Sequence, residues 1–100
     1  MSSYVAEVTK DPDSTIDYKF DWSLWLAETT TTTDTISTSA WTISGDDSVL
    51  TSSSESSTTT TATIWLAAGT AKETYQVTNR IVTAGGRTAD RTMMVTVQER

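Results

Sequence analysis

Between residues 16 and 26, apolar side chains occupy every second position. Successive side chains of an extended chain point to opposite faces, so this alternation predicts a β-strand with one buried face. A helix would scatter the same residues around its axis. Because the run is longer than an average strand, we expect it to bend or end near Trp22. The apolar residues are Ile16, Tyr18, Phe20, Trp22, Leu24 and Leu26.

A second alternating region lies near the C-terminus. Met93, Val95 and Val97 share one face of an expected strand, and an earlier strand carries Tyr75, Val77, Asn79 and Ile81 on one face. Between the two strands, the sequence Ala-Gly-Gly-Arg at 84–87 offers glycines that tolerate the positive φ angles of turns. This pattern predicts a hairpin. Within it, a buried Asn79 amide would need hydrogen-bond partners.

Shorter patterns predict the remaining strands: one at Trp41 and Ile43, one at Val49-Leu50, one at 62–66, and a weak first strand that ends at Pro12. Ser and Thr account for 36 of the 100 residues, and we interpret most of them as outer faces of strands and loops. The Thr tract at 58–61 is interpreted as the start of a strand, because Thr favours β-structure. The tract at 29–33 is interpreted as a loop or edge.

About seven short strands in 100 residues predict an all-β fold, a single immunoglobulin-like antiparallel β-sandwich. The sandwich would form one domain over residues 1–100. Residues 1–14 would serve either as an extended N-terminal arm or as an edge strand.

The composition removes most catalytic chemistry. The chain contains no His and no Cys, so a Ser or Thr nucleophile could take its base only from Lys10, Lys19 or Lys72, and none of these lies in a recognisable motif. A small sandwich also leaves little room for a substrate cleft between paired carboxylates. We therefore expect no enzymatic activity, no catalytic residue and no cofactor.

Acidic residues near the expected turns could offer oxygen ligands to a cation. No calcium-loop pattern is present, and aspartates in turns commonly accept hydrogen bonds from nearby backbone amides. We therefore interpret them as turn residues and expect no metal site. The residues are Asp11, Asp13, Asp17, Asp46 and Asp47.

The net charge of −6 argues against a nucleic-acid partner, because phosphate binding requires a basic surface. Residues 1–55 carry ten acids and two bases, whereas residues 56–100 carry three acids and five bases. This asymmetry would suit charge-steered docking onto a like neighbour or a basic shell. No apolar stretch is long enough to span a membrane, and no signal peptide is recognisable. We therefore expect no membrane partner, and the absence of Cys suits synthesis in a reducing cytosol.

Four tryptophans carry most of the aromatic area. Trp22 and Trp41 fit inward faces and are interpreted as core residues. Trp25 and Trp65 fall on the polar phase of their expected strands, each within a Trp-Leu-Ala tripeptide. Each is either an interface residue or a rim residue turned back toward the core by a bend or bulge.

Three arginines complete the set of interface candidates. Arg80 falls on the outward phase of its expected strand, and Arg87 and Arg91 follow the glycine turn. They are candidate polar contacts, and the alternative is a solvated face.

Two blocks of sequence carry a family resemblance. The first contains Lys-Asp-Pro-Asp at 10–13, Ile-Asp-Tyr at 16–18 and Asp-Trp-Ser-Leu-Trp-Leu at 21–26. The second contains Tyr-Gln-Val-Thr-Asn-Arg-Ile at 75–81, Gly-Arg-Thr at 86–88 and Arg91. Together they resemble a family of small structural proteins of tailed bacteriophages with immunoglobulin-like folds, over about residues 8–97. The resemblance implies a virion component made in the host bacterial cytoplasm, with binding to the capsid shell as the first expectation, and it transfers no contact residue.

Three functions follow as hypotheses. The first is a capsid decoration or cement protein that binds the major capsid protein and stabilises the assembled shell, with many weak contacts summed by avidity. The second is a head–tail or tail component that binds another virion protein. The third is an adhesion module that binds host glycan or surface protein. A glycan binder should expose aromatics beside Asp or Asn, whereas a cement protein should expose a broad apolar strip. Each hypothesis allows a homo-oligomer.

Overall fold

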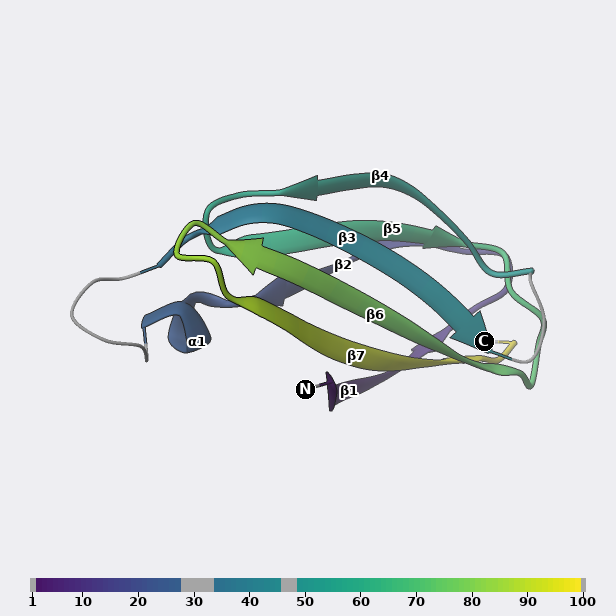
Figure 1. The fold of residues 1–100 in the computed structure, drawn as a ribbon. Coiled ribbons are helices and arrows are strands. Elements are labelled where there is room, and N and C mark those ends of the chain that lie inside the picture. Colours follow the sequence, from purple (N-terminus) through teal and green to yellow (C-terminus); the bar gives the residue numbers. More distant parts are fainter. Residues whose placement is uncertain (1, 28–33, 46–48, 100) are drawn as a thin grey trace.

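The computed structural model describes residues 2–27, 34–45 and 49–99, with residues 2–6 as backbone only. Seven strands form two packed sheets, and one short helix lies at one end (Figure 1). The predicted all-β sandwich is confirmed. The elements are β1 Ser2–Lys10, β2 Thr15–Asp21, α1 Ser23–Ala27, β3 Ile36–Gly45, β4 Thr51–Ser57, β5 Thr61–Ala67, β6 Thr74–Thr83 and β7 Thr88–Val97.

The strand order is that of an immunoglobulin-like sandwich. One sheet has the order β1-β7-β6-β3 and the other the order β2-β5-β4. Six strands match the two groups of that fold, with β2, β5 and β4 in the places of strands B, E and D, and β7, β6 and β3 in the places of strands G, F and C. β1 differs from strand A of that fold, because it joins the sheet of β7 and not the sheet of β2. The pairs β2–β5, β4–β5, β3–β6 and β6–β7 are antiparallel. One pair departs from the expected antiparallel pattern, because β1 runs parallel to β7.

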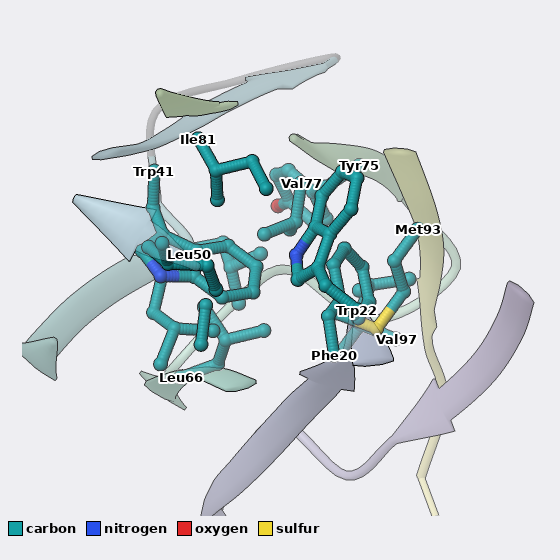
Figure 2. Packing of buried hydrophobic residues seen from close by; sticks show 14 of the residues in the cluster. Phe20, Trp22, Trp41, Leu50, Leu66, Tyr75, Val77, Ile81, Met93 and Val97 are labelled. Carbon is teal, nitrogen blue, oxygen red and sulfur yellow. The ribbon is translucent and has the colours of Figure 1, made fainter. Parts of the chain in front are cut away.

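The core lies between the sheets and is built mainly by the alternation that the sequence predicts, although Ile16, predicted inward, is 41% exposed. In β6 every second residue from Tyr75 to Thr83 is buried, and β7 buries Met93, Val95 and Val97. The aromatic rings of Phe20 and Trp41 meet across the sandwich with their centroids 5.1 Å apart (Figure 2). The predicted hairpin and the two predicted core tryptophans are therefore confirmed: Trp22 is 1% exposed and Trp41 is 8% exposed.

The Ser/Thr-rich middle differs from the prediction. The fourth strand does not include Val49-Leu50 but lies within the polar run, as β4, and all its residues are exposed. Pairing with β5, rather than burial, holds β4 in place, so it has no apolar alternation. A bulge lies between Ser53 and Ser56, and Ser54 has a φ of 52°.

The Thr tract at 58–61 is mostly a turn instead of a strand. The Thr58 hydroxyl accepts hydrogen bonds from the backbone N–H groups of Thr60 and Thr61, and β5 begins only at Thr61. Such local bonding by a hydroxyl competes with strand pairing. The tract at 29–33 and the turn residues Asp46 and Asp47 lie outside the described residues.

The N-terminal strand ends in a buried lysine. Lys10 is 1% exposed, and its Nζ donates to the backbone oxygens of Ala68, at 2.8 Å, and Asp11, at 2.9 Å. Burial lowers the pKa of the Lys10 ammonium, and the charges of Asp11 and Asp13 partly oppose that shift. The Asp11 carboxylate accepts the N–H of Asp13 at 2.7 Å, which confirms its turn role.

Candidate interaction site at the α1 end

The chain leaves the sheet directly after β2. The Asp21 carboxylate accepts the N–H of Ser23 at 2.9 Å, and this hydrogen bond is the main cause that lowers the pKa of Asp21. The N–H of Trp22 donates to the Thr60 oxygen, and that of Leu26 donates back to the Trp22 oxygen. An aspartate that bonds to the amide two residues ahead favours a turn over further strand. The expectation that the strand would bend or end near Trp22 is therefore confirmed.

The change from strand to helix redistributes the side chains beyond Trp22. Leu26 remains fully buried, but Leu24 is 81% exposed although the alternation predicted it inward. Trp25, on the polar phase of the same alternation, is half-buried. Both differences have one cause, since residues two apart share a face in a strand and lie on different sides of a helix. The helix thus places a large apolar side chain in solvent.

Trp22 is the anchor of this end. Its indole Nε1 donates to the Asn79 side-chain oxygen at 2.9 Å, and both residues are almost fully buried. The Asn79 amide nitrogen in turn donates to Ser39 Oγ, at 2.9 Å, and to the Ala40 oxygen, at 3.1 Å. One buried amide therefore ties the segment that enters α1 to both β6 and β3.

Two arginines cover the two tryptophans. The Arg91 guanidinium lies 4.0 Å from the Trp22 ring centroid and donates a hydrogen bond to the backbone oxygen of Asp21. The Arg87 guanidinium lies 4.1 Å from the Trp25 ring centroid. The two rings meet edge to face, 5.5 Å apart at 74°. Both cations lie within cation–π range, which favours one fixed packing of the four side chains.

Asp34 joins this cluster to the β6–β7 turn. Its Oδ1 accepts the N–H groups of Thr35 and Gly85, each at 2.9 Å, and its Oδ2 accepts Arg87 Nε at 3.2 Å. These bonds, together with the Thr83 hydroxyl as the largest cause, lower the pKa of the Asp34 carboxyl to about 2. The chain just before β3 is thus fixed against the glycine turn and against the cation over Trp25.

The two sequence blocks that carried the resemblance therefore meet at this end of the sandwich. Trp22 and Trp25 come from the first block, and Asn79, Arg87 and Arg91 come from the second. A family model described as the podophage GP4 fiber-tail adaptor protein gp77 matches residues 10–96. The chain belongs to this fiber-tail adaptor family. No curated protein matches the chain.

Membership of the adaptor family decides between the hypotheses at a coarse level. The chain is a structural protein of the phage virion, it is not an enzyme, and it is a tail component. The family supports the tail alternative better than the capsid decoration that we expected first. Within the described residues, no helix is long and apolar enough to cross a membrane.

The five predicted interface residues do not form one surface. Trp25, Arg87 and Arg91 lie together in the cluster at the α1 end. Arg80 lies on the outer face of the four-stranded sheet, where its guanidinium forms a two-bond ion pair with Asp90 at 2.7 and 2.8 Å. That pair and its neighbours line a depression of about 300 Å³.

Trp65, the fifth predicted residue, lies on the outer face of the three-stranded sheet and is 39% exposed. The rim interpretation fits Trp25, whose ring packs against Trp22. The outward interpretation fits Trp65.

Two important residues of this adaptor-family chain carry only weak sequence signals. Asp34 stands alone after a Thr-rich tract, and nothing local indicates its link to Gly85, 51 positions away. Leu24 sits in phase with the buried residues of the preceding strand. Its exposure could have been found only by placing the helix start, for which Asp21 two residues before Ser23 was the available signal.

Proposed function

We propose that this protein links a fiber to the phage tail by protein–protein contacts, and that the α1 end is one of its contact surfaces. The observation that carries the proposal is the exposed Leu24 side chain on a short helix in which Leu26 is buried and Trp25 packs against Trp22. The family description supports the adaptor role.

The surface around Leu24 has the composition of a protein contact. Tryptophan and arginine are among the residues most enriched in binding hot spots. Here Trp25 is part of the helix, Arg87 stacks on its ring, and Arg91 stacks on Trp22 just before the helix. A rigid contact surface loses little conformational entropy on binding. The buried Trp22–Asn79 hydrogen bond and the stacked cations supply that rigidity.

The decisive experiment measures binding of the purified chain to the tail and fiber proteins of its own phage. Leu24→Asp should weaken binding to one of the two partners at least about tenfold, because it places an unpaired charge in an apolar contact. Val49→Asp is the matched control: Val49 is also exposed, at 45%, and lies next to the start of β4, at the end of the sandwich away from α1 (Figure 1).

Two results would contradict the proposal. If Leu24→Asp and Val49→Asp bind both partners as tightly as the unmodified chain does, the α1 end is not the contact surface. If the chain binds expanded capsids and neither the tail nor the fiber protein, the adaptor role itself is wrong.

A further inference from the structure

The outer face of the three-stranded sheet has a single large aromatic side chain at its centre. Trp65 lies on β5, the middle strand, with Asp17 of β2 directly opposite on one side and Ser53 of β4 opposite on the other. Directly opposed residues of antiparallel strands have Cβ atoms about 4.5–5.5 Å apart. The ring therefore lies between a carboxylate and a hydroxyl in one row across the sheet.

The rest of this face is polar. The strand alternation places hydroxyl groups, one ammonium group and one methyl group around the Trp65 row, and no second large apolar side chain. The α1 end differs, because there the exposed Leu24 is next in sequence to Trp25, which packs against Trp22. The outward neighbours on the three strands are Thr15, Lys19, Thr51, Thr63 and Ala67.

On the outer face of the other sheet, by contrast, polar side chains pair with one another. There Arg80 pairs with Asp90, and the hydroxyls of Thr78 and Thr92 bond to each other at 3.0 Å. On the Trp65 face, the side chains of Asp17, Ser53 and Thr63 have no hydrogen-bond or ion-pair partner within the described part of the chain. Their polar groups are free to bind a ligand.

We propose that the Trp65 face binds carbohydrate, with a neutral pyranose ring stacked on the indole and its hydroxyls bonded to Asp17 and Ser53. A pyranose has a face of C–H groups that suits the aromatic ring, and its edge carries hydroxyls that can bond to the flanking carboxylate and hydroxyl side chains. A carboxylate accepts hydroxyl hydrogens in charge-assisted bonds. A protein partner would find only one ring here, without the apolar surroundings that exclude water from a hot spot.

The expected affinity is weak. The face offers one stacking ring and no enclosing groove, so a single site should bind a short oligosaccharide with a Kd on the order of 1 mM. Several copies in one virion would raise the effective affinity for a polymer. The inference does not depend on the adaptor role, since it uses a different surface and a different class of ligand.

The test is an NMR titration of the full 15N-labelled chain with cellotriose, maltotriose and chitotriose. At least one sugar should shift the Trp65 indole signal and the amides of residues 15–19, 51–53 and 63–67, and leave the Trp22 indole in place. Trp65→Ala should abolish these shifts and Asp17→Ala should weaken binding at least about threefold, since one charge-assisted bond is lost. Leu24→Ala, on α1, is the control and should bind as the unmodified chain does.

Absence of any Trp65 shift with all three sugars at about 20 mM, twenty times the expected Kd, would overturn the proposal. So would a Trp65→Ala variant that keeps sugar binding, or one that instead loses binding to the tail or fiber protein. If Leu24→Asp does not weaken binding to the tail or fiber protein, the sugar-binding inference still stands, because the two assays use different ligands.

Discussion

At the scale of single residues, two buried polar side chains join parts of the chain that are distant in sequence. Asn79 satisfies the Trp22 indole and two acceptors on β3, and Lys10 satisfies two backbone oxygens at the other end of the sandwich. The sequence showed that Asn79 must be buried and partnered, because it falls on the apolar phase of a clear strand. It showed nothing comparable for Lys10, since one lysine at the end of a weak strand looks like any exposed lysine.

Replacing Asn79 should be severe. Asn79→Ala leaves the buried Trp22 Nε1 without an acceptor and opens a small cavity, so we expect a loss of about 2–4 kcal/mol in the free energy of unfolding. Urea denaturation followed by tryptophan fluorescence measures it. Gln76→Ala, at an exposed position of the same strand, should change stability by less than about 0.5 kcal/mol. Equal midpoints for the two variants would show that the buried amide is dispensable.

Lys10→Met tests the second buried polar group. Methionine keeps the apolar stem but removes the donor, leaving the oxygens of Ala68 and Asp11 unpaired, so unfolding free energy should fall by about 1–3 kcal/mol. Lys19→Met, at an exposed position of β2, is the control and should be nearly neutral. A Lys10→Met protein as stable as the Lys19→Met protein would mean that water replaces the ammonium at no cost.

At the scale of elements, the alternation predicted strands well where one face is buried and poorly where it is not. β6 and β7 follow their apolar phase, whereas β4 has no buried face and exists because β5 pairs with it. The apolar alternation of β2 continues past the end of the strand, because Trp22, just after the strand, and Leu26, in the helix, are both buried at even positions. Local hydrogen bonds to the Asp21 carboxylate and the Thr58 hydroxyl set the end of β2 and the start of β5. The spacing of apolar residues carries no information about such bonds.

The contact between the segment before β3 and the β6–β7 turn should be sensitive to acid. The pKa of Asp34 is lowered to about 2 in the folded chain, so its stabilising effect is fully present above the ordinary aspartate pKa near 4. It is lost as the pH falls from about 4 to about 2. The pKa of Asp90 is also lowered, by its hydrogen bonds to Arg80, and acts in the same direction.

Urea midpoints measured between pH 2 and pH 5 check this expectation. Stability should decrease steeply as the pH falls through the window, and Asp34→Asn should be less stable at pH 5 and show a shallower decrease. Adding Asp90→Asn should flatten the curve further. An Asp34→Asn protein with the same pH slope as the unmodified chain would show that the carboxylate is not linked to folding.

At the scale of the whole molecule, the sandwich is elongated, 47 by 23 by 20 Å, and its surfaces are chemically distinct. The α1 end exposes Leu24 over stacked aromatics, one outer face exposes Trp65 among free polar groups, and the other outer face pairs its own charges. The fold class could be predicted from strand count alone. The convergence of 21–26 with 79–91 into one cluster could not, because it depends on which strands the chain places side by side.

The parallel pairing of β1 with β7 gives the molecule a mechanical property. The register runs from Ser2 opposite Asp90 to Lys10 opposite Val97, so a force that draws the two ends of the chain apart acts along both strands in opposite directions. All rungs of that ladder then share the load and must break together, instead of opening one after another as in a hairpin pulled from its ends. Single-molecule stretching should show a high unfolding force that disappears when β1 is deleted, and such resistance would suit the fiber link proposed above.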